Sequence, residues 1–158
     1  MNNDFLKELG YLGLIARFKR LSDSMLYSIR DLYKLEDIDI EPNWHLVFLI
    51  LKKYKTRTIT EIAKSFHISQ PAIVKIINKM EKKGYIDIIK DTHDNRKRQL
   101  QLSQKAISQL PKFEKIWQAG RQSIKEMLEG NQTFLDLLEN FEQQIEDKSF
   151  KERVSDHL

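Results

Sequence analysis

The hydrophobic residues of the first segment recur at helical spacing. Between residues 4 and 34 they lie three or four positions apart, which places them along one stripe of a helix. This stripe consists of Leu14, Phe18, Leu21, Met25, Ile29 and Leu32. A second apolar set lies on another side of the same segment, and it consists of Phe5, Leu9, Leu12, Ile15 and Leu26. We therefore predict one long helix, or two joined helices, that contacts its own domain and a second copy of the chain.

The next apolar segment follows a loop through residues 37–40. Pro42 suits the first turn of a helix, because its missing N–H has no helical partner there. The apolar residues after it keep helical spacing and therefore predict a buried scaffold helix. They are Trp44, Val47, Phe48, Ile50 and Leu51.

Two short helical patterns come next, and residues 67–68 between them leave room only for a tight turn. Thr60 is the predicted N-cap of the first helix, with Glu61 favourably placed in its first turn. Ser69 is the predicted N-cap of the second helix, where Pro71 is tolerated in the first turn. The inward stripe of this second helix consists of Ile73, Ile76, Ile77 and Met80. Two short helices joined by a tight turn predict a helix-turn-helix.

The periodicity changes after Gly84, which we expect to end the second helix. The segments "YIDIIK" and "RQLQLS" are rich in strand-forming residues, and "QLQL" alternates strictly. The letters "DTHDN" between them have the chemistry of a turn. We therefore predict a two-stranded hairpin. A helix-turn-helix followed by a basic hairpin is a winged helix.

Helical spacing returns after the hairpin. We predict a helix over residues 103–120 that is capped by Ser103 and kinked or broken at Pro111, and another helix over residues 122–130. A last helix should cover residues 133–150, with Phe134, Leu137, Leu138, Phe141 and Ile145 on one face.

The fold class predicted from these patterns is mainly α with a small β-hairpin wing. A winged helix-turn-helix core occupies residues 37–106. Dimerisation helices flank it at residues 1–36 and 107–158, and the three segments form one intertwined domain.

Composition narrows the cellular context. The sequence has no cysteine, which removes disulfides and thiolate chemistry and fits a reducing cytoplasm. The N-terminus is acidic where a signal peptide would be basic, and no apolar run approaches the roughly 18 residues that span a bilayer. We expect a soluble, cytoplasmic protein without a membrane segment.

Charge is distributed unevenly along the chain. Residues 57–98 contain ten Lys or Arg and five Asp or Glu, a net charge of +5. Residues 107–158 contain seven basic and ten acidic residues, a net charge of −3. A basic middle beside an acidic tail is typical of a local surface that binds a polyanion.

The outward face of the second short helix suits duplex DNA, whose major groove is about 12 Å wide and admits an α-helix. This face consists of Gln70, Ala72, Val74, Lys75, Asn78 and Lys79. The amides can pair with adenine, the small apolar groups can meet a thymine methyl, and the lysines suit phosphates. Ser69 and the helix N-terminus can bind phosphate. Thr60 and Pro71, near the starts of the two helices, complete the DNA-binding candidates here.

The hairpin adds a second candidate contact. Arginine is attracted into narrow minor grooves by their negative potential, and the hairpin carries Arg96 and Arg98. Asp94, two residues before Arg96, can pair with a guanidinium and fix the shape of the tip, which leaves Arg96 aimed outward. This role of Asp94 is a hypothesis.

Residues 60–103 resemble the DNA-binding core of the MarR family of regulators. The resemblance is carried by "TEIAKSFHIS", "PAIVKIINKMEKKGYI" and "DNRKRQLQLS". It implies that Asp94 and Arg96 are the aspartate and the minor-groove arginine of the family's wing, with Arg98 as a second candidate. It also implies a homodimer formed through the flanking helices and a winged-helix repressor of transcription on a pseudo-palindromic operator.

Two positions depart from the family pattern. Many members have an arginine shortly after the glycine that ends the recognition helix, and this chain has Ile88 there. After the wing, a common Leu-Thr-x-x-Gly is replaced by Leu102, Ser103 and then Ala106, which keeps a cap.

Other readings of the sequence are weaker. There is no glycine-rich phosphate loop, nucleophile elbow or carboxylate–histidine pair, so we expect neither an enzyme nor a cofactor. The histidines are scattered, so we expect no metal site. Aromatic residues such as Trp44, Phe48, Phe113 and Trp117 suit a core or an interface better than a ligand cage. A small-molecule effector would bind between the dimer helices and the DNA-binding core. The rival function is a winged helix used only for protein contact.

Overall fold

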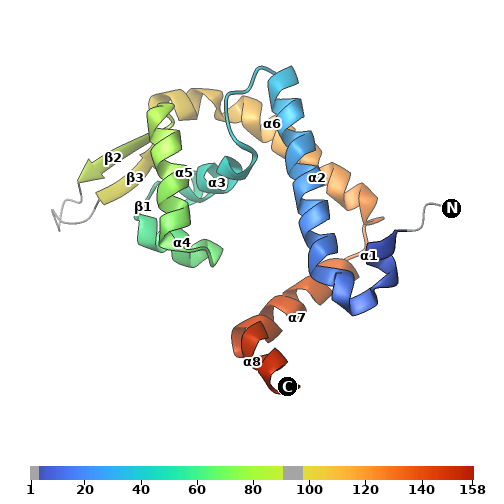
Figure 1. The fold of residues 1–158 in the computed structure, drawn as a ribbon. Coiled ribbons are helices and arrows are strands. Elements are labelled where there is room, and N and C mark those ends of the chain that lie inside the picture. Colours follow the sequence, from blue (N-terminus) through green and yellow to red (C-terminus); the bar gives the residue numbers. More distant parts are fainter. Residues whose placement is uncertain (1–3, 91–97) are drawn as a thin grey trace. The chain divides into compact units, whose positions relative to one another are not determined.

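The computed structural model of the chain describes residues 4–90 and 98–158. The chain divides into two compact units, Met1–Phe113 and Glu114–Leu158. The first unit holds the N-terminal helices and a small three-stranded sheet, whose second and third strands project outward beside the two helices that precede them (Figure 1). The predicted class, mainly α with a small wing, is confirmed.

The N-terminal segment forms two α-helices joined by a 3₁₀ turn. These are α1 (Phe5–Glu8), η1 (Gly10–Gly13) and α2 (Leu14–Leu35). A Cβ on Gly13 would lie 2.1 Å from the carbonyl oxygen of Leu6, so only glycine allows the chain to turn back this closely. Of the two predicted forms, the joined helices are therefore the correct one.

The winged-helix core contains three helices and three strands. They are α3 (His45–Tyr54), which follows the 3₁₀ turn η2 (Pro42–Trp44), then β1 (Thr56–Arg57), α4 (Ile59–Phe66), α5 (Gln70–Lys82), β2 (Ile86–Lys90) and β3 (Arg98–Leu102). The sheet is antiparallel with the order β1-β3-β2. The sheet therefore has one strand more than the predicted two-stranded hairpin. The additional strand, β1, has two residues and is too short to show an alternating pattern.

Aromatic side chains fill the centre of this core. Phe48 is fully buried and packs edge-to-face against Tyr85 and Phe113, with ring centroids 5.5 and 5.4 Å away. The Tyr85 hydroxyl donates to Oε1 of Gln109 at 3.1 Å, and burial raises the pKa of Tyr85. The expected core position is confirmed for Phe48 and Phe113. Trp44 is buried but also lines a pocket described below, and Trp117 is half-buried.

A long helix, α6 (Gln104–Met127), follows the sheet. Oγ of Ser103 accepts from the backbone N–H of Ala106 at 3.1 Å, so the predicted Ser103 cap is confirmed. The helix continues through Pro111 and past Gly120, and the predicted division into two helices is wrong. Burial of apolar residues around the proline, Leu110 and Phe113 among them, offsets the hydrogen bond that proline removes.

The chain ends with α7 (Thr133–Asp147) and α8 (Phe150–Ser155). The helix predicted over residues 133–150 ends three residues early, because Ser149 starts a new helix by forming a capping box with Glu152. Among the residues described, no helix is both long and apolar enough to cross a membrane.

Candidate nucleic-acid interface

The helix-turn-helix consists of α4 and α5. Thr58 caps α4: its hydroxyl accepts from the backbone N–H of Glu61 at 3.2 Å, and its own backbone N–H donates to the Glu61 carboxylate at 2.7 Å. Thr60, the predicted N-cap, lies inside the helix, and that prediction is wrong because Glu61 must stand three residues after the cap to close this box. His67 ends α4 in the left-handed conformation at φ 52°.

The starting turn of α5 follows the sequence prediction. Ser69 occupies the N-cap position in extended conformation, and Pro71 lies in the first turn. Within the described part of the chain, the Ser69 side chain makes no capping hydrogen bond. Ser69 and the first residues of α5 are exposed. The backbone N–H groups at this helix start favour an anion.

The two faces of α5 differ sharply. Ile73, Ile77 and Met80 are fully buried, which anchors the helix on the core. The opposite side presents exposed Gln70, Lys75, Asn78 and Lys79, with half-buried Ala72 and Val74 between them. Gly84 then turns the chain at φ +75°, and the Tyr85 N–H donates to the Met80 carbonyl at 2.9 Å. The candidate base-reading residues therefore share one accessible surface.

The wing begins with the pairing of β2 and β3, whose register runs from Ile86↔Leu102 to Lys90↔Arg98. Arg98 is exposed at the end of β3 nearest the hairpin tip. Asp94 and Arg96 lie outside the described residues. Ile88, at the position where family members often have arginine, is partly exposed on β2.

A basic cluster at the end of α3 was absent from the predicted site. The guanidinium of Arg57 lies 3.9 Å from the centroid of the Tyr54 ring, and the Lys53 ammonium lies 4.9 Å from it. A hydrogen bond from Lys53 is the main cause that lowers the pKa of Tyr54. The run "KKYKTR", with four basic residues in six, was the sequence signal for this cluster.

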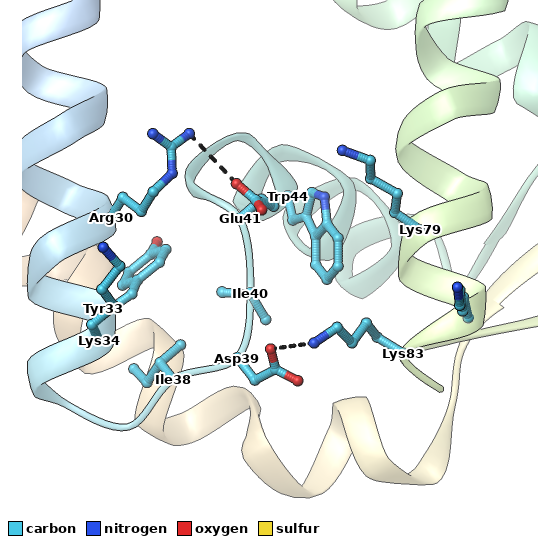
Figure 2. Close-up of a pocket in the computed structure, with 11 residues that line it drawn as sticks. Arg30, Tyr33, Lys34, Ile38, Asp39, Ile40, Glu41, Trp44, Lys79 and Lys83 are labelled. Carbon is cyan, nitrogen blue, oxygen red and sulfur yellow. Dashed lines mark hydrogen bonds and ion pairs between the residues drawn. The ribbon is translucent and has the colours of Figure 1, made fainter.

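A pocket of about 520 Å³ lies between α2, the segment 38–41 and α5 (Figure 2). Trp44 forms part of its wall. Two ion pairs cross it, between Arg30 and Glu41 at 3.6 Å and between Lys83 and Asp39 at 2.5 Å. The remaining cations of the lining are Lys34, Lys79 and Lys82. Basic groups outnumber the carboxylates, so the pocket favours an anion.

The comparison with protein families identifies this core. The family model described as MarR family matches residues 38–97, which include the helix-turn-helix and β2 and end just before β3. This match spans 60 of the 158 residues, so the core of the chain is similar to the MarR family. The comparison with curated proteins finds no match.

Solved structures of MarR-family proteins share this fold. A MarR protein from Peptoclostridium difficile has a TM-score of 0.67 and 20% identity, covering 96% of this chain and 93% of that chain. The S. aureus MepR–DNA complex has a TM-score of 0.69 and 21% identity, covering 82% of this chain and 96% of that chain. A mutant E. coli MarR complexed with operator DNA has a TM-score of 0.64 and 16% identity, covering 90% of this chain and 99% of that chain. At these identities the likeness shows the fold alone.

Proposed function

We propose that this protein is a transcriptional regulator of the MarR type that binds a pseudo-palindromic DNA site as a homodimer. The observation that carries the proposal is the division of α5 into a buried isoleucine stripe and an accessible polar face. A helix held in this way can enter a major groove without exposing apolar surface. The relatives solved with DNA support the same reading.

Each candidate on this surface has a proposed task. Gln70 and Asn78 read base edges, while Lys75 and Lys79 contact phosphates. Small side chains at Ala72 and Val74 let the helix approach thymine methyl groups. Thr60, Ser69 and Pro71 face the backbone near the helix starts, where N–H groups favour phosphate. In the wing, Asp94 orients Arg96 toward the minor groove, with Arg98 beside it.

Exposed apolar residues on the flanking helices support the homodimer. In α1, η1 and α2 they include Phe5, Tyr11, Leu12, Ile15 and Leu21. In α7 and α8 they include Phe134, Leu137, Phe141, Ile145, Phe150 and Val154. Large apolar surfaces of this kind mark protein interfaces. A two-fold dimer would place two recognition helices about 34–36 Å apart, which predicts half-site centres about 10 base pairs apart.

The pocket supports control by a small anion. A carboxylate or phosphate entering it would compete with Asp39 for Lys83 and with Glu41 for Arg30. The Arg30 pair joins the segment 38–41 to α2, and the Lys83 pair joins it to the C-cap of α5, so loss of the second pair would alter how the recognition helix is held. Such an effector regulates only if it binds one of the two arrangements more tightly. We propose a repressor that is released in this way.

DNA binding is tested by electrophoretic mobility shift over a range of salt concentrations. The affinity should fall steeply with salt, with a log–log slope near −0.9 for each phosphate neutralised. Selection of bound fragments from the source genome would then give the operator, and its symmetry would test the dimer. Negligible DNA retention at low salt would contradict the proposal and favour the rival function, a winged helix that contacts only proteins.

A further inference from the structure

We infer that Lys53, Tyr54 and Arg57 form a second DNA-backbone contact, on the edge of the sheet opposite β2. We call these three residues the Tyr54 platform. This inference rests on the proposed function, but the platform is separate from the outward face of α5 and from the hairpin tip. It predicts phosphate contacts that do not depend on base sequence.

The chain builds the platform with a sharp reversal. Tyr54 ends α3, and Lys55 follows with φ 69° and ψ −55°, close to the values of a γ-turn that is rare and strained outside glycine. The turn brings Arg57 back over the ring of Tyr54, 3.9 Å from its centroid. Lys53, one residue before the tyrosine, approaches the same ring at 4.9 Å. Two cations from different elements therefore meet on one aromatic side chain.

This arrangement orients the guanidinium and keeps it available. Arg57 also pairs with Glu61, but the nitrogen–oxygen distance is 3.8 Å, beyond direct hydrogen-bond range. The carboxylate therefore orients the guanidinium from a distance, and the hydrogen bond between Arg57 and the Tyr54 hydroxyl uses only part of its five N–H donors. An arginine stacked on an aromatic ring loses less side-chain freedom when it binds phosphate than a free surface lysine does. The preorganised fork suits a phosphate oxygen pair.

The strand register connects the platform to the wing. Arg57 on β1 stands opposite Leu100 on β3, so both side chains lie on the same face of the sheet. Arg98 is two residues along β3 from Leu100 and shares that face, which makes it the diagonal neighbour of Arg57 at about 7–8 Å. Arg98 is thus the described cation of the wing that lies beside the platform on the sheet.

Charge favours a polyanion as the partner. The segment from Lys52 to Arg57 contains four basic residues and no acidic one. Like charges this close repel each other, and part of that repulsion persists in the folded protein. A phosphate placed beside them relieves the repulsion, and a duplex already held by α5 supplies a row of phosphates at short spacing.

The test compares Arg57→Gln and Lys53→Gln with the wild-type chain. Fluorescence anisotropy measures binding to the selected operator and to a mixed-sequence duplex of about 30 base pairs, long enough for two half-sites. Each variant should weaken binding to both duplexes by roughly tenfold, the effect of one charge-assisted hydrogen bond. The slope of log affinity against log salt should become shallower by about 0.9. Arg57→Lys, which keeps the charge, should restore most of the slope.

The matched control is Lys19→Ala on α2, an exposed cation outside the winged-helix core. It should leave both the affinity and the slope unchanged. Circular dichroism of each variant checks that the fold is retained. If both glutamine variants bind as the wild type does, or lose affinity only for the operator, the platform is overturned while DNA binding stands. If the wild-type chain binds neither duplex, the proposed function itself is overturned, and the platform with it.

Discussion

The winged-helix core buries its hydrophobic residues, whereas the helices that flank it leave many of theirs exposed. Within the core, α3 alone buries Val47, Phe48, Ile50 and Leu51. The 22-residue α2 buries only Tyr33 among its described residues, and Tyr11 and Leu12 in the turn before it are 98% and 86% exposed. The core buries its apolar residues within one chain, whereas the flanking helices carry exposed apolar faces.

This difference assigns the two regions different tasks. Burial within one chain fixes the shape of the core and leaves its polar groups free to meet DNA. In the proposed dimer, covering the exposed apolar faces would contribute roughly 25 cal/mol per Å² to association. Substitutions in either region test this difference. The four tests below run from the largest expected effect to the smallest.

Phe48→Ala should have the largest effect. Phe48 is 0% exposed and its ring packs against Tyr85 and Phe113. Removing a buried phenylalanine leaves a cavity, so the free energy of unfolding should fall by about 3–5 kcal/mol. Leu49→Ala is the matched control, because Leu49 is the next residue of α3 but is 43% exposed. Urea denaturation measures both variants, and equal losses would contradict the assignment of the core.

Leu137→Lys tests the flanking helices. Leu137 is 62% exposed on the apolar face of α7. A lysine placed without a partner in a dimer interface costs several kcal/mol, so the dissociation constant of the dimer should rise by about a hundredfold or more. Analytical ultracentrifugation across protein concentration measures this constant. Gln143→Lys adds the same charge on the opposite side of α7 and should leave it unchanged, and a shift of equal size in both variants would argue against this face.

The outward face of α5 gives intermediate effects. Gln70→Ala and Asn78→Ala should relax base preference, each by about 1–3 kcal/mol at one position of the operator. Lys75→Ala should instead weaken every duplex alike and make the salt slope shallower by about 1. Binding to a library of operator variants separates the two patterns. If all three variants behaved identically, the division between base readers and phosphate contacts would be wrong.

Elements with several turns of periodic sequence were predictable, and short local features were less so. The isoleucine stripe of α5 and the alternation before Ser103 gave the helix-turn-helix and the hairpin, because period is the strongest signal in a sequence. The two-residue β1 shows no period, so the position of Arg57, and with it the Tyr54 platform, could not be predicted. The pocket lies where it was expected, between a flanking helix and the core, but its lining depends on how α2 meets α5, which local patterns do not encode.

Two helix boundaries were missed although the sequence held the information. Thr58 with Glu61, and Ser149 with Glu152, both follow the spacing of a capping box. In both cases the helix start is marked by a hydroxyl residue together with the glutamate three positions later. Pro111 shows the reverse error: a residue that often breaks helices was given more weight than the apolar residues around it.

Thr58→Ala gives the smallest of the four effects and tests this reading of α4. The substitution removes the hydroxyl that accepts from Glu61, so the free energy of unfolding should fall by about 1 kcal/mol. Thr60→Ala, two residues later and inside the helix, should change it by only a few tenths of a kcal/mol. Thermal denaturation of both variants measures the difference. If the larger loss came from Thr60, the capping box would not be the start of α4. Because Arg57 pairs with Glu61, the loss at Thr58 should also loosen the guanidinium and weaken DNA binding slightly, on every sequence alike.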